Sequence, residues 1–336
     1  MKIGIDLSQI VYGTGVSVYT ENLVKNLLKI DKKNDYLLFG GSLRQKNKLK
    51  KFGAKVFPFP PTVADFVWNK LHLFPIENFL GPIDIFHSSD WAQPPTKAKK
   101  ITTIHDLAVL RYPETFPPKT VSVHQRRLKW VKKEIDMVIA VSQSTKKDII
   151  ELLNIPEKKI KVIYEGVGED FKPQSSAKIE KVKKKYQIKG DFLLAFAGPD
   201  RKNLDRIKKA CQGFNLFVIG EPYISQEDLP SLYSGALCLV YASLYEGFGL
   251  PVLEAMKCGC PVITSNISSL PEVVGQAGLL VDPLDVEEIS RGISEIINNK
   301  EKREELIKKG FAQVKKFSWE KAARETLKVY QEVFKQ

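Results

Sequence analysis

The sequence predicts an α/β fold of two parallel sheets, each doubly wound with helices on both faces. Short apolar runs alternate with longer segments whose apolar residues recur every three or four positions, and this alternation is typical of parallel strands joined by helical crossovers. The turn-rich stretch Glu165–Pro173 interrupts the alternation once, and it resumes afterwards. A chain of 336 residues, 43% hydrophobic and 27% charged, is long enough for two domains with a core each.

Seven short apolar runs in the first half are predicted strands. They are Lys2–Leu7, Tyr36–Phe39, Lys55–Phe59, Ile83–His87, Ile101–Asp106, Met137–Val141 and Lys161–Tyr164. The first predicted helix follows Gly13-Thr14-Gly15, and its apolar residues fall on one helical face. These residues are Val16, Tyr19, Leu23, Leu27 and Ile30. We expect residues 1–168 to form the first domain.

The second half repeats the pattern with five predicted strands. They are Phe192–Ala197, Phe214–Ile219, Ala236–Ala242, Pro261–Thr264 and Gly278–Val281. Ala236–Ala242 is apolar throughout, which indicates a strand buried on both faces. We expect residues 174–317 to form the second domain and residues 318–336 to form a separate terminal helix that opens at Ser318.

The net charge of +13 favours an anionic partner. Nucleic acid is not expected, because no binding motif is present and aromatic residues do not interleave with the basic runs. The segment Lys119–Ile135 predicts a basic helix that contains Arg126-Arg127, Trp130 and Lys132-Lys133. This helix fits either a peripheral contact with an anionic membrane or a domain helix with a solvated basic face.

Several absences narrow the class of protein further. No window of 18 apolar residues predicts a membrane span. The chain enters a strand directly at MKIGIDLSQI, which is not the pattern of a signal peptide. The four cysteines lie in apolar or helical contexts and lack the spacing of a zinc site. We therefore expect a cytoplasmic protein with reduced thiols, which could also bind peripherally to the inner face of the membrane.

One stretch carries the strongest functional signal. The predicted strand Ala236–Ala242 leads into the loop Glu246–Gly249, and a helix then opens at Leu250-Pro251. A glycine loop at a helix N-terminus favours a phosphate, whereas Glu246 and Glu254 favour the hydroxyl pairs of a ligand. A nucleotide sugar combines these groups, because its diphosphate lies between a sugar diol and a ribose diol.

The run EGFGLPVLEAMKCGCPVITSN resembles the signature of retaining glycosyltransferase family 4, whose fold is called GT-B. Glu246 and Glu254 match two family glutamates eight residues apart. Other segments resemble the family in the same order: TTIHDLAVLRYPETF, VIAVSQSTKKDI, KIKVIYEGVGEDF and GLLVDPLD. The resemblance implies two Rossmann-like domains facing each other across a cleft. The first would bind the acceptor and the second the nucleotide sugar, and the C-terminal helix would cross back to the first domain.

The resemblance also implies a set of donor-binding residues in the second domain. Glu246 would bind hydroxyls of the transferred sugar, and Glu254 would bind the ribose. Backbone N–H groups would bind the diphosphate and sugar at Gly247, Phe248, Gly249 and Leu250. Lys202 matches a family lysine that stabilises the leaving diphosphate. The arginine match is poorer, because Gly198-Pro199 stands where many members have Gly-Arg, and Arg201 would take over that role.

In the first domain the resemblance implies three further contacts. His105 corresponds to an active-site histidine near the transferred sugar, so we expect His105, Glu246 and Lys202 to be the catalytic residues. Gly13 and Gly15 lie where the family's first glycine loop contacts donor phosphate and acceptor. His87 ends another predicted strand and is expected to line the acceptor side. His72 and His124 have no such context.

The family mechanism implies catalysis without a protein nucleophile, because the donor's own phosphate oxygen takes the acceptor proton. No D-x-D run is present to hold a metal diphosphate, so we expect metal independence and no cofactor beside the nucleotide sugar. The segments around His105 are most similar to mannosyltransferases, which favours GDP-mannose over a UDP-sugar. The expected acceptor is a glycan or lipid-linked glycan of polysaccharide biosynthesis.

The second domain departs from the family pattern in its length. Between Arg201 and Tyr241 the family has two strands, whereas this chain shows one, Phe214–Ile219. The form of the base pocket therefore stays open. An alternative is a non-catalytic GT-B protein with a degenerate donor pocket, acting as a glycan-binding or partner subunit. A dinucleotide-dependent dehydrogenase is excluded, because Gly13 and Gly15 are not followed by the third glycine of that motif.

Overall fold

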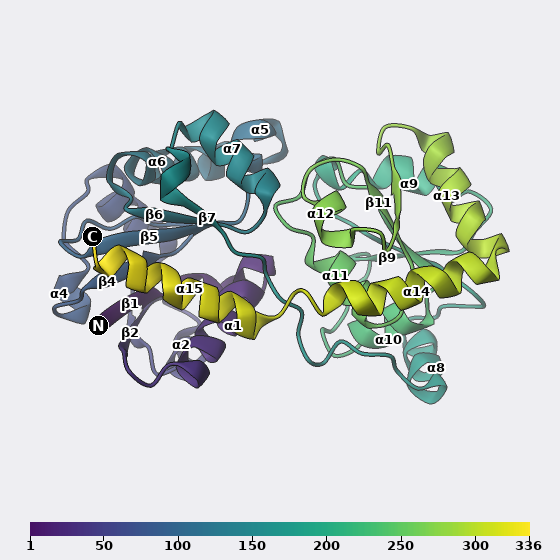
Figure 1. Cartoon of the computed structure of the whole chain (residues 1–336), viewed down its shortest axis with the longest axis horizontal. Helices are drawn as coiled ribbons and strands as arrows, with labels where there is room; N and C mark the ends of the chain where they lie inside the picture. The colour runs from purple at the N-terminus through teal and green to yellow at the C-terminus, as the bar shows by residue number, and fades with distance from the viewer. The chain divides into compact units, whose positions relative to one another are not determined.

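A computed structural model describes all 336 residues of the chain. The residues form two compact units (Figure 1). Unit 1 contains Met1–Gly166 together with Trp319–Gln336, and unit 2 contains Val167–Ser318. Each unit is a parallel sheet with helices, as the alternating sequence pattern predicted. No helix in the chain combines the length and the apolar character that crossing a membrane requires.

The sheet of unit 1 has seven parallel strands in the order β3-β2-β1-β4-β5-β6-β7. The strands are β1 Lys2–Asp6, β2 Asp35–Gly41, β3 Lys55–Phe57, β4 Ile85–Ser88, β5 Lys99–Ile104, β6 Met137–Ala140 and β7 Ile160–Val162. All seven predicted strands are present. Every residue of β4 and β6 is buried, because helices cover both faces of a parallel sheet.

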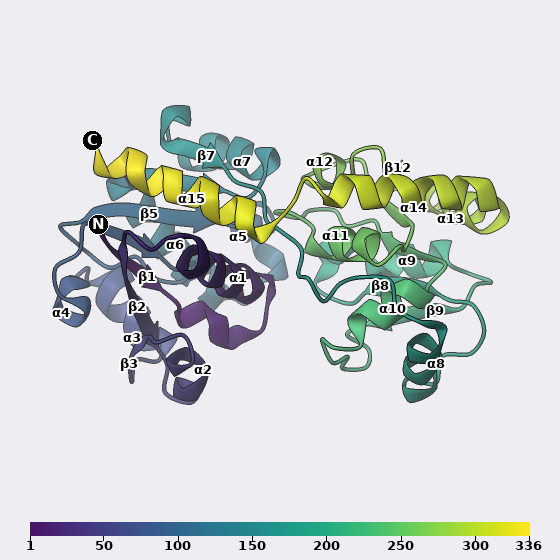
Figure 2. The same cartoon turned by 60° about the horizontal axis from the view of Figure 1, so that its bottom comes forward.

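The helices of unit 1 are α1 Gly15–Ile30, α2 Lys46–Lys50, α3 Pro61–Ala64, α4 Glu77–Leu80, α5 Ala108–Arg111, α6 Pro118–Glu134, α7 Gln143–Leu153 and α15 Trp319–Phe334. Short 3₁₀ or π segments are η1 Ser8–Tyr12, η2 Asp65–Lys70, η3 Pro113–Thr115 and η4 Glu157–Lys159. The predicted apolar face of α1 is buried at Tyr19, Leu23 and Leu27. Helix α15 lies alongside α1 (Figures 1 and 2).

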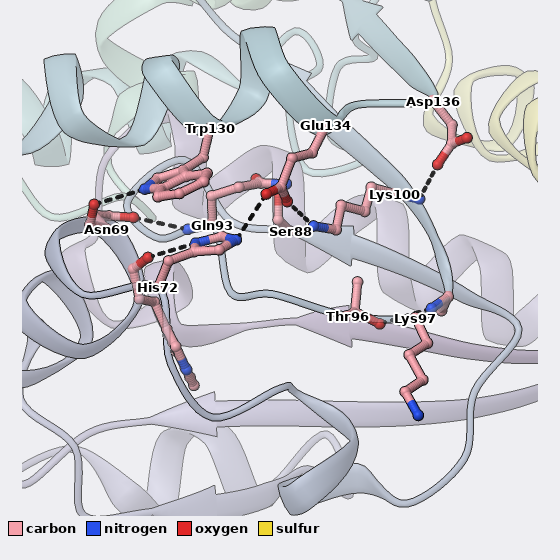
Figure 3. A network of polar contacts seen from close by, with 12 residues as sticks. Asn69, His72, Ser88, Gln93, Thr96, Lys97, Lys100, Trp130, Glu134 and Asp136 are labelled. Atoms are coloured by element: carbon pink, nitrogen blue, oxygen red, sulfur yellow. Dashed lines mark hydrogen bonds and ion pairs between the residues drawn. The ribbon is translucent and has the colours of Figure 1, made fainter.

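Helix α6 covers nearly the predicted residues, but two of its side chains do not face solvent. Arg127 is only 1% exposed, and it donates to Asp90 Oδ1 at 3.1 Å and to Thr102 Oγ1 at 2.6 Å. Trp130 donates its Nε1–H to the Asn69 carbonyl at 2.8 Å and stacks on His72 (Figure 3). Arg127 is therefore buried and not available to a membrane, and Trp130 is half-buried and held by these contacts, so both residues favour the alternative of a domain helix.

Unit 2 has five parallel strands in the order β12-β11-β10-β8-β9. They are β8 Leu193–Phe196, β9 Leu216–Ile219, β10 Cys238–Tyr241, β11 Val262–Ser265 and β12 Leu279–Val281. The helices are α8 Ser176–Lys185, η5 Asp200–Lys202, α9 Leu204–Ala210, α10 Leu229–Gly235, α11 Leu250–Lys257, α12 Leu270–Val274, α13 Val286–Asn298 and α14 Lys300–Val314. The predicted shortening is present, since β9 is the one strand between β8 and β10.

Each sheet has one point at which the strand order reverses. In unit 1 the chain builds β1, β2 and β3 in one direction and then adds β4 on the other side of β1. In unit 2 it builds β8 and β9 and then adds β10 on the other side of β8. At such a switch point the neighbouring crossover helices diverge, which leaves a crevice beyond the carboxyl ends of the strands where ligands bind. The two switch points are therefore the first places to look for a site.

Candidate functional site

The switch point of unit 2 brings together Lys202, which follows β8, and Glu246, which follows β10. Lys202 Nζ donates to Glu246 Oε1 at 2.7 Å and to the Tyr241 hydroxyl at 2.6 Å. Burial alone would lower the pKa of Lys202, but Glu246 and Tyr241 together raise it well above its usual value. Lys202 is thus a fixed positive charge at the carboxyl edge of the sheet.

The glycine loop after Glu246 is held by two serines of the next loop. The Glu246 carbonyl accepts from Ser268 Oγ at 2.6 Å and from Ser269 Oγ at 3.0 Å. Gly249 has φ +110°, and a Cβ there would lie 2.8 Å from Leu270 Cδ2, so only glycine fits without strain. Leu250 begins α11, Pro251 has no N–H, and the Val252 amide donates to the Gly249 carbonyl at 3.0 Å. The loop therefore directs a helix N-terminus to the same edge as Lys202.

Glu254 lies on α11 and accepts from the Tyr233 hydroxyl at 2.9 Å. Burial raises the pKa of its carboxyl to about 7, although the bond from Tyr233 acts in the opposite direction. Arg201 lies beside Lys202 in the short helix η5, and its carbonyl accepts from the Leu244 amide at 2.8 Å. This bond joins the loop after β8 to the loop after β10. All the predicted donor-binding residues of the second half thus belong to unit 2 and to elements at its switch point.

In unit 1, His105 follows β5 and is buried against Glu165. His105 Nδ1 lies 3.1 Å from Glu165 Oε1, and the Tyr19 ring meets the imidazole edge-on at 4.6 Å. Burial would lower the pKa of His105, but the hydrogen bond and charge of Glu165, with Asp90 and Asp106, raise it. His105 Nε2 is buried and has no hydrogen-bond partner in the protein. This nitrogen is therefore left to meet a ligand.

Sequence reasoning missed the role of Glu165, because Glu165 was assigned only to the turn between the domains. Its side chain is 4% exposed and reaches a residue 60 positions earlier in the chain. The one available signal was its position at the carboxyl end of a predicted strand, since His105 also lies at the carboxyl end of one. Tyr241 and Tyr233 were missed for a similar reason, since apolar runs and helices commonly contain tyrosines that make no polar contact.

The expectation that His87 lines the acceptor side is wrong. His87 Nδ1 lies 2.7 Å from the Tyr330 hydroxyl of α15, and its Nε2 lies 3.0 Å from Thr103 Oγ1. Burial lowers its pKa to about 3, so the ring is neutral and both its nitrogens are satisfied. His87 therefore holds α15 on unit 1 and has no atom left for a ligand.

The predicted glycine loop of unit 1 has a clear local role. Gly13 ends η1 with φ +71°, and Gly15 is the first residue of α1. Between them Thr14 forms a capping box with Ser17, which satisfies amides at the start of α1. The two glycines thus make a tight turn into a helix at the end of β1. Whether they also contact a ligand remains an expectation.

The unit 2 site has the chemistry of a diphosphate and hydroxyl site. A fixed lysine charge and a helix N-terminus suit the phosphates, while two carboxylates can accept hydrogen bonds from hydroxyl pairs. A family model described as "Glycosyl transferases group 1" matches residues 145–313, which is half of the chain. The chain belongs to this family. A second model, "Glycosyltransferase Family 4", matches residues 13–171.

Comparisons with individual proteins agree with this assignment. The chain is 33% identical over 280 residues to the O-antigen chain mannosyltransferase B of Escherichia coli, covering 73% of this chain and 74% of that protein. The protein is thus a glycosyltransferase, and the non-catalytic alternative is not supported.

Solved structures support the fold. Sucrose-phosphate synthase from Thermosynechococcus elongatus superposes with a TM-score of 0.76 at 18% identity, over 99% of both chains. Anabaena Alr3699/HepE, solved in complex with UDP-glucose, superposes with a TM-score of 0.73 at 16% identity, over 99% of this chain and 100% of that one. The fold is therefore GT-B, as the sequence resemblance predicted.

Proposed function

We propose that the protein is a retaining mannosyltransferase that transfers mannose from GDP-mannose to a glycan or lipid-linked glycan acceptor without a metal ion. The Lys202–Glu246 pair at the unit 2 switch point carries this proposal. It provides a positive charge for the diphosphate and a carboxylate for sugar hydroxyls within 2.7 Å of each other. The choice of mannose is supported by the 33% identity to a mannosyltransferase.

The proposed reaction breaks the bond between the sugar C1 and the diphosphate oxygen and forms a bond from C1 to the acceptor oxygen. The acceptor attacks from the face that the diphosphate leaves, and its proton passes to a diphosphate oxygen, so GDP is released. Lys202 and the N-terminus of α11 stabilise the charge that develops on the diphosphate. Glu246 and Glu254 orient the sugar and ribose hydroxyls, and His105 Nε2 meets a hydroxyl or phosphate oxygen. The lysine charge makes a metal unnecessary for this step.

The first test is calorimetric titration of GDP and of UDP into the protein in EDTA, with wild-type protein and the Glu254→Ala variant. We expect micromolar binding of GDP, weakened roughly 10-fold to 150-fold in the variant, because a hydrogen bond to a carboxylate contributes about 1.5–3 kcal/mol. Glu227→Ala is the matched control, since Glu227 is an exposed carboxylate of the same unit.

Three results would contradict separate parts of the proposal. Equal or tighter binding of UDP would contradict the choice of donor. Turnover that is lost in EDTA and restored by Mg²⁺ or Mn²⁺ would contradict metal independence. A product whose anomeric proton signal shows inversion at C1 would contradict the retaining mechanism.

We also propose that unit 1 binds the cytoplasmic face of an anionic membrane through residues 61–74. Five large apolar side chains there are 39–57% exposed: Val63, Phe66, Leu71, Leu73 and Phe74. Basic groups border them, since Lys70 Nζ lies 5.6 Å from the Phe66 ring and α6 packs against η2. The exposed lysines of α6 are Lys129, Lys132 and Lys133. Exposed apolar side chains with lysines on the same and the adjacent helix complement the interface of an anionic bilayer.

A further inference from the structure

The switch point of unit 1 carries a second group of side chains that the donor chemistry does not use. Asp6 is the last residue of β1, and Tyr12 ends the short helix η1 that follows it. Asp90 and Trp91 lie just after β4, the neighbouring strand on the other side of the reversal. His124 comes from α6. Four segments, β1, η1, the loop after β4 and α6, therefore place aromatic and acidic side chains at one point of the sheet edge.

The aromatic rings of this group form a continuous wall. The Tyr12 and Trp91 ring centroids are 5.6 Å apart at an interplanar angle of 50°, and the Trp91 and His124 centroids are 4.9 Å apart at 52°. Tyr12 is 39% exposed, and Trp91 is half-buried. Tyr12 and Trp91 also line, together with Asp6, a narrow cavity of about 20 Å³, which is too small to hold a sugar. The rings are tilted rather than parallel, so they form no flat slot for a base.

Two carboxylates lie beside this wall in fixed positions. Asp6 is 3% exposed, and its Oδ1 accepts from the Ser8 amide at 2.9 Å and from Ser8 Oγ at 2.5 Å. Asp90 Oδ1 accepts from the buried Arg127 at 3.1 Å, which leaves its other oxygen without a hydrogen bond. His124 is half-buried, and neither of its ring nitrogens is hydrogen-bonded. The two carboxylates beside the aromatic wall are therefore hydrogen-bond acceptors that the protein already holds in position before a ligand binds.

Aromatic faces beside fixed carboxylates suit a ligand that has both apolar C–H faces and hydroxyl groups. A phosphate fits poorly, because the carboxylates repel it and Arg127 is already bound. We propose that Tyr12, Trp91, His124 and Asp90 form a binding subsite for a pyranose ring, the terminal sugar of the saccharide acceptor. One ring face of the sugar lies on Trp91, and its hydroxyls donate to the open oxygen of Asp90. The acceptor role rests on the proposed function, whereas the binding of a saccharide does not.

The test uses the intrinsic fluorescence of the protein, titrated with α-linked mannobiose in EDTA and without any nucleotide. The chain has four tryptophans, and a sugar on Trp91 changes the emission of that one. We expect a saturable change with wild-type protein and its loss in Trp91→Ala. In the transfer assay, we expect Trp91→Ala and Tyr12→Ala each to raise the acceptor KM about tenfold or more, which corresponds to about 1.4 kcal/mol. GDP binding by calorimetry is expected to be unchanged.

Tyr223→Ala is the matched control, because Tyr223 is a highly exposed aromatic residue of unit 2. It is expected to change neither the fluorescence titration nor the acceptor KM. Absence of a saturable change with wild-type protein, or an acceptor KM unaltered in both unit 1 variants, would overturn the subsite. The same fluorescence change produced by GDP alone would also overturn it. Saccharide binding without any transfer would instead refute the proposed function and leave the subsite standing.

Discussion

At the switch point of unit 2 a lysine and a carboxylate meet beside a glycine loop, whereas at that of unit 1 carboxylates meet aromatic rings. Both places arise from the same reversal of strand order in a parallel sheet. The topology thus determines where each site lies, and the side chains at the strand ends determine the ligand chemistry. A fixed cation suits the phosphates of a donor, while rings and carboxylates suit a sugar.

The two units also use the glutamates of their sites differently. In unit 2, Glu246 pairs with a lysine that stays charged at any physiological pH. In unit 1, Glu165 faces a histidine whose charge depends on pH, and the pair leaves His105 Nε2 unbonded. The first pair is therefore expected to be insensitive to pH and the second to impose a pH dependence on activity.

The largest expected effect is the loss of Lys202. The Lys202→Ala variant removes the charge that we propose for the diphosphate, so we expect kcat/KM for transfer to fall by roughly 100-fold to 1,000-fold, the usual size for one electrostatic group in a transition state. Steady-state kinetics with GDP-mannose measures this fall. Lys208→Ala is the control, because Lys208 makes an exposed ion pair with Glu221 in the same unit. Equal activity of Lys202→Ala and the control would show that Lys202 does not take part in the transfer.

The next effect concerns the Glu165–His105 pair. Because Glu165 raises the pKa of His105, the imidazolium that donates from Nε2 persists to higher pH, and activity that needs it falls as pH rises through that raised pKa. We expect Glu165→Gln to lower kcat about thirtyfold and to move this fall toward lower pH. The pH profile of kcat measures both. If kcat falls equally at every pH and the pH profile does not shift, the role of Glu165 is only structural.

The smallest effect concerns the exposed apolar residues of unit 1. We expect Phe74→Ala to weaken binding to vesicles that contain phosphatidylglycerol about tenfold, because it removes apolar area that enters the bilayer interface. Vesicle flotation at low salt measures the binding. Phe214→Ala is the control, since Phe214 is an exposed phenylalanine of unit 2. No flotation of the wild-type protein, or equal flotation of both variants, would contradict the membrane contact.

The sequence predicted the strands because each is a short apolar run, and burial on both faces of a parallel sheet requires such runs. Ala236–Ala242 contains β10, and Lys2–Leu7 contains β1. Lys202 and Glu246 were both identified. Their direct pairing was not, because it depends on β8 and β10 being neighbours in the sheet. That adjacency is a tertiary property with no local pattern in the chain.

The spacing of residues in α6 could have shown that Arg127 is buried. Arg127 lies four residues after Val123 and four before Val131, so it falls on the same helical face as these two buried residues. Its charge was taken as a sign of exposure. Asp90 and Thr102, which satisfy the buried guanidinium, lie 37 and 25 residues away in the sequence. Charge alone therefore predicts exposure only where no distant partner compensates it.

Helix α15 has a consequence for biosynthesis. Its residues complete unit 1, where Tyr330 contacts His87, although 152 residues of unit 2 separate it from the rest of that unit. A chain emerging from the ribosome can fold unit 2 as a contiguous segment, whereas unit 1 stays incomplete until α15 has been made. The side of α1 that contacts α15 is uncovered in the meantime. Unit 1 therefore completes its packing only after all of unit 2 has been synthesised.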